Sequence, residues 1–292
     1  MKILIAGASG QLARAFQKSL QGPHYRVTAL DKTQMDVGET SSVSEALSIH
    51  KPDTVINCAA YNLVDKAEED ERIAFRVNAE GVRNLASECR KNGVFLVHYS
   101  TDYVFDGTKE GLYTEDDTPN PLSNYARSKL SGEQYLREAT DNFLLFRVSW
   151  VFGEGTQNFL HKVNEWAMNR KILKIVCDQV SIPTYTQDIV NVTMFAIGKG
   201  LKGLYHLANS GYASRYEVVR YYLEKLGHDI LVMPVTSSYF PSPARRPYFS
   251  VLSSQKLSTE LNIDMPHWKT GVDRYIEETM TGIRLSKRKA GI

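Results

Sequence analysis

The stretch that decides the fold is Lys2-Ile3-Leu4-Ile5-Ala6-Gly7-Ala8-Ser9-Gly10-Gln11-Leu12-Ala13, at the start of the chain. Its apolar first half predicts a buried strand, and apolar residues at helical spacing from Leu12 onward predict a helix. Between them, Gly7 permits a tight turn and Gly10 lets the backbone approach a pyrophosphate, whose charge the helix N-terminus stabilises. The turn therefore predicts a dinucleotide site that includes Gln11 and Leu12. An ordinary strand-to-helix turn without a ligand is the alternative interpretation.

The next predicted strand, residues 25–30, ends in two charged residues that favour different cofactors. Asp31 lies roughly 20 residues after the glycines, where a carboxylate can accept hydrogen bonds from the ribose hydroxyls of NAD. Lys32 can pair with the 2′-phosphate of NADP. The sequence therefore predicts NADPH or NADH and does not rank them. Asp36 and Val37 suit a contact with the adenine edge, although a turn residue and a core valine explain them equally well.

Predicted strands and helices alternate beyond this point. Apolar runs at residues 54–58, 94–99 and 143–148 predict further strands, with helical patterns between them. This alternation predicts an α/β protein with a Rossmann-type, doubly wound parallel sheet. We expect this dinucleotide-binding core to occupy residues 1–148. A smaller C-terminal substrate-binding lobe is expected over residues 149–292, with segments that return to the core.

Two features after the strand at 54–58 concern the cofactor side of the sheet. Ala59 and Ala60, followed by Tyr61, are small residues where the chain would pass under a cofactor. Asn78 lies inside a predicted helix, where an asparagine has only middling propensity and needs a reason. Exposure is one explanation, and a polar link to the active site is the other.

A candidate catalytic set lies between residues 97 and 129. Tyr125 and Lys129 are four residues apart on a predicted helix, so they share one face. An ammonium group this close favours the phenolate and is expected to lower the pKa of Tyr125, which would make it a usable general acid or base. Thr101 supplies a hydroxyl at the carboxyl end of a strand, where open α/β sheets bind ligands. Most Tyr-x-x-x-Lys pairs are solvated helix faces. The predicted dinucleotide turn earlier in the chain is what favours a catalytic role for this pair.

Composition excludes several classes of function. Among 292 residues, 35 Lys and Arg balance 33 Asp and Glu, and a net charge of +2 gives no reason to expect nucleic acid. No apolar run approaches the ~18 residues of a membrane span. The three cysteines, Cys58, Cys89 and Cys177, are isolated and have the spacing of neither a disulfide framework nor a zinc site. No cluster of carboxylates indicates a metal site. We therefore expect a cytoplasmic protein, for which a homodimer is a possible assembly.

Motifs spread over the chain, to about Ile276, resemble one family. Besides the glycine turn and the Tyr-x-x-x-Lys pair, they lie at residues 57–68, 76–81, 98–107, 149–151, 158–159, 178–184, 205–206 and 243–247. Together they resemble the extended short-chain dehydrogenase/reductases, and most closely the dTDP-4-dehydrorhamnose reductases. The sequence departs from the family pattern at three places: Ala13 in place of Gly, Asn62 where Thr is frequent, and residues 180–182 in place of a Gly-containing run.

The resemblance implies a reaction and a set of site residues. The reaction is NAD(P)H-dependent reduction of the 4-keto group of dTDP-4-dehydro-L-rhamnose to dTDP-L-rhamnose, used for cell-surface polysaccharide. Tyr125, Lys129 and Thr101 would be catalytic, and Tyr99 would join the cofactor site. The implied substrate contacts are Thr101, Asp102, Tyr103, Trp150, Asn158, Arg245 and Arg246. An Arg pair fits a dTDP pyrophosphate because guanidinium binds phosphate in bidentate fashion. A surface ion pair explains the arginines, and a core position explains Trp150, without any ligand.

Two alternative functions are left open by the sequence. A related reductase-like protein is the non-catalytic regulatory subunit of methionine adenosyltransferase, and other extended reductases or epimerases act on other keto-sugar nucleotides. Sugar-nucleotide 4,6-dehydratases are disfavoured because they carry an Asp-Glu pair where this chain has Asp102 and Tyr103. Without the second carboxylate, elimination has no base, and hydride delivery is the chemistry left.

Overall fold

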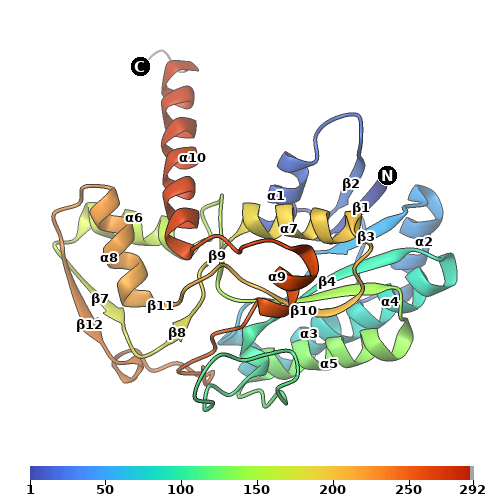
Figure 1. Cartoon of the computed structure of the whole chain (residues 1–292), viewed down its shortest axis with the longest axis horizontal. Coiled ribbons are helices and arrows are strands. Elements are labelled where there is room, and N and C mark those ends of the chain that lie inside the picture. The colour runs from blue at the N-terminus through green and yellow to red at the C-terminus, as the bar shows by residue number, and fades with distance from the viewer. Residues whose placement is uncertain (290–292) are drawn as a thin grey trace.

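The computed structural model describes residues 1–289, with side chains described up to residue 279. Its centre is a parallel six-stranded sheet with the order β10-β5-β4-β3-β1-β2 (Figure 1). The strands are β1 (Lys2–Ala6), β2 (Arg26–Leu30), β3 (Thr54–Asn57), β4 (Phe95–Thr101), β5 (Phe143–Val148) and β10 (Gly203–Leu207). The strand order reverses direction between β1 and β3, the position where such sheets bind ligands. The predicted Rossmann-type α/β fold is confirmed.

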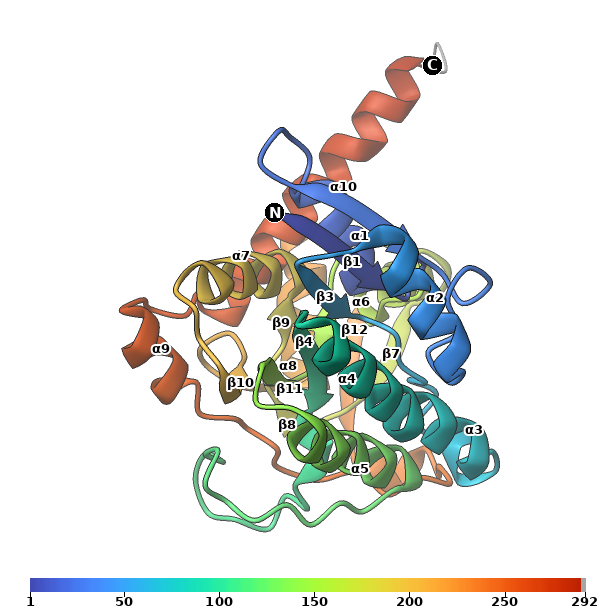
Figure 2. The same cartoon turned by 90° about the vertical axis from the view of Figure 1, so that its right-hand side faces the viewer.

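Helices cover both faces of the sheet, because the side chains of each strand alternate between two separate cores. Ile3 and Ile5 of β1 pack with α1 (Gln11–Ser19) and α7 (Thr186–Gly198). Leu4 and Ala6 pack on the opposite face with the helices α2 (Thr40–His50), α4 (Gly81–Asn92) and α5 (Asn124–Ala139). Figure 2 shows β1, β3 and β4 between these two layers.

The segment between β3 and β4 is an interrupted helix. The 3₁₀ turn η1 (Lys66–Glu68) precedes α3 (Glu71–Phe75), and a π-helical turn, η2 (Arg76–Glu80), joins α3 to α4. Single π turns inside helices are frequent at functional sites. Asn78 lies in this turn and is buried, which excludes exposure as the explanation for its position.

A second hydrophobic core forms the smaller lobe, at the left of Figure 1. It is built by the parallel pair β7 (Ile172–Val176) and β12 (Leu231–Val235) with α6 (Phe159–Asn169), α8 (Arg215–Lys225) and the start of α10 (Trp268–Lys289). Short strand pairs tie the chain together, β6 (Val151–Phe152) with β9 (Thr184–Tyr185) and β8 (Val180–Ser181) with β11 (Ala213–Ser214). The remaining elements are η3 (Asp102–Val104), η4 (Ser237–Tyr239) and α9 (Gln255–Leu261).

The chain crosses between core and lobe more than once. After β5 it enters the lobe, and it returns to the sheet with α7 and β10. It then builds α8 in the lobe before α9 packs beside β10. None of the helices within residues 1–289 is long and apolar enough to span a bilayer.

Candidate active site

The three candidate catalytic side chains come together at the carboxyl end of β4. Tyr125 is the second residue of α5, whose start is fixed by the Ser123 hydroxyl as it accepts a hydrogen bond from the Ala126 amide at 3.3 Å. One turn later, Lys129 is only 2% exposed and donates from Nζ to the Tyr99 carbonyl oxygen at 2.6 Å. Thr101 ends β4, and its hydroxyl affects the ionisation of Tyr125 directly. The predicted grouping is therefore present in the structure.

The electrostatics of the pair differ from the sequence expectation. Burial raises the pKa of Tyr125, and this effect outweighs the lowering by the Thr101 hydroxyl, while the charge of Asp102 raises the pKa further. Burial also lowers the pKa of Lys129 to about 8, against the opposing charge of Glu133. The expected lowering of the tyrosine pKa by the lysine is thus wrong for this structure. The phenol therefore carries its proton at neutral pH and is available as a donor, but burial alone makes it a weaker acid than a free tyrosine.

The glycine turn has the tight geometry expected of a phosphate cradle. Gly7 has φ +79°, and a Cβ there would lie 2.7 Å from the backbone of Ala59. Gly10 precedes α1 in extended conformation, and its amide donates to the Gly7 carbonyl at 2.9 Å. Gln11 and Leu12 are the first two residues of the helix, so their amides lie at its positive end.

The residues expected at the adenosine end divide into two groups. Asp31 and Lys32 follow β2, and the Asp31 carboxylate accepts hydrogen bonds from Thr33, which lower its pKa. Asp36 instead forms an ion pair with Arg76 at 2.9 Å. Val37 is 4% exposed and packs in the core under α2 and α4. The adenine contact expected of Val37 is therefore wrong for its side chain, which is a core valine, and Asp36 has an intramolecular partner.

The floor of the site is held by Asn78. Its side chain accepts a hydrogen bond from the Tyr61 amide at 2.8 Å and donates to the Tyr61 carbonyl at 3.0 Å. It also donates to the Ser128 hydroxyl at 3.0 Å, on the helix that carries Tyr125. This amide thus joins the Ala59–Tyr61 segment to the catalytic helix, which is the polar link that the sequence left open.

Tyr99 corrects another expectation. Its ring stacks on Phe146 with centres 6.0 Å apart, and its hydroxyl pairs with Thr193 of α7 at 2.8 Å. The side chain is therefore part of the hydrophobic core. Only the backbone carbonyl of Tyr99 takes part in the site, as the acceptor for Lys129.

Asp102 is a buried carboxylate and not a surface that a sugar can reach. It is 2% exposed and accepts hydrogen bonds from three hydroxyls, those of Thr101 at 3.2 Å, Ser149 at 3.0 Å and Ser250 at 2.6 Å. Burial raises its pKa to about 6 despite these bonds. The expected substrate contact is wrong, and Asp102 joins the end of β4 to two segments of the C-terminal half.

Replacing Asp102 with Asn is expected to raise the melting temperature at neutral pH by at least a few degrees. A folded-state pKa of about 6 against an ordinary 3.8 means that folding is disfavoured once the carboxylate ionises, above about pH 6. The stabilisation should be on the order of 1–3 kcal/mol at neutral pH and should shrink as pH falls from 6 towards 4. Thermal unfolding at several pH values measures it. The exposed Asp116→Asn is the matched control, and a lower melting temperature for Asp102→Asn at neutral pH would contradict this account.

The remaining expected substrate residues have different environments. Trp150 is half-buried with φ +34° and packs against Phe159. Asn158 is 5% exposed, caps α6 through the amides of residues 160 and 161, and donates to the Tyr275 hydroxyl, so its expected substrate contact is wrong. Tyr103 is half-buried, and its ring meets Tyr125 edge-on, with centres 6.2 Å apart. Its expected place beside the substrate is compatible with this position.

The two adjacent arginines do not act as a pair. Arg246 forms a two-point ion pair with Asp65, with Nη1–Oδ1 at 2.9 Å and Nη2–Oδ2 at 2.7 Å. Arg245 is exposed at the surface. The double clamp on a pyrophosphate stays a prediction, and in the structure one of the two guanidinium groups has a carboxylate partner.

Sequence reasoning missed two residues that shape the site. Glu68 accepts a hydrogen bond from the Asn124 amide at 2.8 Å and so fixes the start of the catalytic helix. Arg215 lines a narrow cleft with Tyr103 and Ser250. A carboxylate in a helical turn and one arginine in an amphipathic helix carry no distinctive sequence signal, and only the fold brings them to the site.

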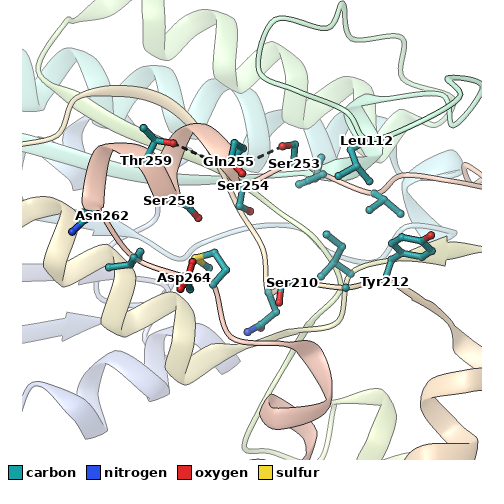
Figure 3. A pocket seen from close by; sticks show the side chains of 17 residues that line it. Leu112, Ser210, Tyr212, Ser253, Ser254, Gln255, Ser258, Thr259, Asn262 and Asp264 are labelled. Atoms are coloured by element: carbon teal, nitrogen blue, oxygen red, sulfur yellow. Dashed lines mark hydrogen bonds between the residues drawn. The ribbon is translucent and has the colours of Figure 1, made fainter.

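A separate pocket of about 590 Å³ lies beside α9 and contains none of the predicted site residues (Figure 3). Figure 3 shows uncharged polar side chains such as Ser258 and Ser210 around it. Asp264 is the one charged residue in its lining. With no cation, this pocket is a poor site for the phosphates of a cofactor or a sugar nucleotide.

The residues at the glycine turn, with a Tyr-x-x-x-Lys pair at the end of β4, define a dinucleotide-dependent oxidoreductase of the short-chain dehydrogenase/reductase class. A family model described as the RmlD substrate binding domain matches residues 1–281. The chain belongs to that family.

Three relatives show how complete the similarity is. The dTDP-4-dehydrorhamnose reductase of Burkholderia thailandensis is 35% identical, covering 96% of this chain and 100% of that protein. The spore coat polysaccharide biosynthesis protein SpsK of Bacillus subtilis is 34% identical, with 95% and 97% covered. The crystal structure of dTDP-4-dehydrorhamnose reductase from Bacillus anthracis, in complex with NADP, has a TM-score of 0.93 at 32% identity, covering 95% of this chain and 99% of that one.

Within residues 1–289, no group of three or more His, Cys, Asp or Glu side chains is placed to hold a metal ion.

Proposed function

We propose that this protein reduces the 4-keto group of dTDP-4-dehydro-L-rhamnose to dTDP-L-rhamnose with NADPH or NADH. The observation that carries the proposal is the buried Tyr125, which keeps its proton, beside Lys129 and Thr101 at the switch-point edge of the sheet. The similarity to dTDP-4-dehydrorhamnose reductases over almost the whole chain supports the choice of substrate. The name of the Bacillus subtilis relative supports a place in polysaccharide synthesis.

The glycine turn fits the pyrophosphate of a dinucleotide. Gly10 presents open backbone at the N-terminus of α1, with no side chain between the helix amides and an anion. Asp31 and Lys32 at the end of β2 suit the adenosine ribose, with or without a 2′-phosphate. When bound, the reduced nicotinamide supplies the hydride that C4 of the sugar receives.

The side chains of the chain supply the proton and the orientation. As C4 gains hydride, negative charge develops on the carbonyl oxygen, and the Tyr125 hydroxyl donates its proton to that oxygen. The Thr101 hydroxyl stabilises the same developing charge by hydrogen bonding. Lys129, held by the Tyr99 carbonyl, places an ammonium group where it can bind the ribose hydroxyls of the nicotinamide.

Replacing Gly10 with Val is expected to weaken NADPH binding by at least about 100-fold, or about 2.8 kcal/mol. A Cβ at Gly10 would already lie 3.2 Å from the Gly7 carbonyl oxygen, so the branched methyls must enter the space of the turn. Fluorescence titration with NADPH and NADH measures the effect. Gly198→Val is the matched control, because a Cβ there meets nothing within 4 Å. Unchanged affinity in the Gly10 variant would remove the pyrophosphate assignment.

We also infer that the protein works in the cytoplasm and can form a homodimer. Free thiols at Cys58, Cys89 and Cys177 support a reducing compartment. Cell fractionation tests the location, and the mass from light scattering tests the assembly. A membrane-bound fraction or a strictly monomeric mass would contradict the respective inference.

A further inference from the structure

Arg215 is a cation that no carboxylate among the described side chains pairs with. It is the first residue of α8, and its guanidinium carbon lies 5.3 Å from the ring centres of both Trp150 and Phe159. Among residues with described side chains, Arg215 forms no ion pair. The aromatic faces hold the guanidinium by cation–π attraction and leave its N–H edge available.

The start of α8 fixes the position of this side chain. Ser214 and Glu217 form a capping box, in which the Ser214 hydroxyl accepts from the Glu217 amide at 3.2 Å and the Glu217 carboxylate accepts from the Ser214 amide at 2.7 Å. Arg215 thus projects from the positive end of an 11-residue helix. Because the Glu217 carboxylate already caps this helix end, the guanidinium of Arg215 is the group that favours an anion here.

Arg215 faces the catalytic side of the molecule. It lines a narrow gap of about 10 Å³ with Tyr103, Gln179 and Ser250, so the two sides of this gap must separate before a diphosphate can enter. Tyr103 in turn packs edge-on against Tyr125. An anionic part of a substrate held by Arg215 would therefore lie one aromatic ring away from the proton donor.

The carboxylate of Asp65, which responds to the charge of Arg215, is paired with another arginine. The carboxylate of Asp65 has its pKa lowered mainly by the hydrogen bond from Arg246, and the positive charge of Arg215 contributes as well. Arg246 neutralises Asp65 through its two-point ion pair, so the carboxylate does not cancel Arg215. Trp150, whose ring lies under Arg215, has φ +34°, a conformation that is unfavourable for a non-glycine residue and persists where surrounding structure or function demands it.

We propose that Arg215, presented by the faces of Trp150 and Phe159, binds the diphosphate of the sugar nucleotide. The proposal rests on the proposed function for the identity of the nucleotide, but its chemistry is that of any nucleoside diphosphate. It adds a third arginine to the two expected from the resemblance. It also gives Trp150 a role in positioning the guanidinium, beside the substrate contact that the resemblance implied.

The test is the affinity for dTDP and UDP of the full-length protein, measured by calorimetry in the presence of NADPH. Arg215→Met should weaken nucleoside diphosphate binding by at least about tenfold, or about 1.4 kcal/mol. The dissociation constant for NADPH should stay within about twofold, and Arg215→Lys should recover part of the loss, because an ammonium keeps the charge but loses the bidentate fork. In turnover, the KM of the sugar nucleotide should rise while kcat changes little.

Arg220→Met is the matched control, since Arg220 is an exposed arginine on the same helix that lies over Tyr216. It should leave every constant unchanged. Nucleoside diphosphate affinity within twofold of the original in Arg215→Met would overturn the proposal, and so would an equal loss in Arg220→Met. A chain that binds UDP and not dTDP, yet loses UDP in Arg215→Met, would instead refute the proposed substrate and keep the Arg215 site.

Discussion

Replacing Tyr125 with Phe is expected to slow hydride transfer by about 10²–10⁴-fold, the usual contribution of a positioned general acid. This corresponds to roughly 3–5 kcal/mol of transition-state stabilisation. The physical reason is that burial keeps the proton on Tyr125, and Phe leaves the developing alkoxide with the Thr101 hydroxyl alone. Thr101→Val should be milder than Tyr125→Phe, because it removes a hydrogen bond and keeps the proton donor.

Single-turnover oxidation of NADPH, followed by absorbance, measures this step without product release. The cofactor affinity of Tyr125→Phe should stay close to the original, since one hydroxyl is lost. Tyr135→Phe is the matched control, because Tyr135 lies on the same helix and packs against Arg83. A near-normal rate in Tyr125→Phe would end the proton-donor assignment and favour a regulatory, non-catalytic protein.

Replacing Lys129 with Met is expected to weaken cofactor binding and slow turnover together, which separates its role from that of Tyr125. Each effect should exceed about tenfold, because an ammonium hydrogen-bonded to charged or polar partners contributes about 1.5–3 kcal/mol. The folded-state pKa of Lys129 is about 8, below its ordinary 10.5, so the buried charge opposes folding at neutral pH. The melting temperature of Lys129→Met at neutral pH should therefore not fall.

The same pKa predicts how the original protein responds to pH. Cofactor affinity should decline as pH rises through about 8, where Lys129 loses its proton in the folded state. The unfavourable effect of this lysine on stability should be relieved between about pH 8 and 10.5, since the unfolded chain holds the proton longer. Lys202→Met, at an exposed lysine, is the control. A Lys129 variant that binds NADPH normally would contradict the assigned role.

The core of the fold was predictable because its signals are local. The apolar run of β1 ends in Gly7 and Gly10, and this one turn implies a strand, a helix and a ligand edge. The spacing of Tyr125 and Lys129 likewise places both on one face of α5 wherever that helix packs. The glycine turn and the Tyr125–Lys129 pair could therefore be predicted before the packing was known.

The substrate side was less predictable because long-range packing decides it. Asp102 looks like a site residue in sequence, but Ser149 and Ser250, distant along the chain, enclose it. Asn158 stands at the start of a helix that the sequence does predict, but its bond to the Tyr275 hydroxyl comes from the far end of the chain. Arg246 likewise meets Asp65 from the other half of the chain, a pairing that no local pattern indicates. The pKa of Tyr125 is also a property of burial, which the Lys129 spacing alone did not reveal.

The central claim is tested most directly by mixing the original protein with NADPH and dTDP-4-dehydro-L-rhamnose in a single turnover. The account predicts oxidation of one NADPH per sugar. When NADPH carries deuterium at C4 on the face from which hydride is transferred, the deuterium should appear at C4 of dTDP-L-rhamnose. UDP- and GDP-linked keto sugars, run in parallel, should react far more slowly. No NADPH oxidation with the dTDP sugar, or faster reaction of a UDP or GDP sugar, would contradict it.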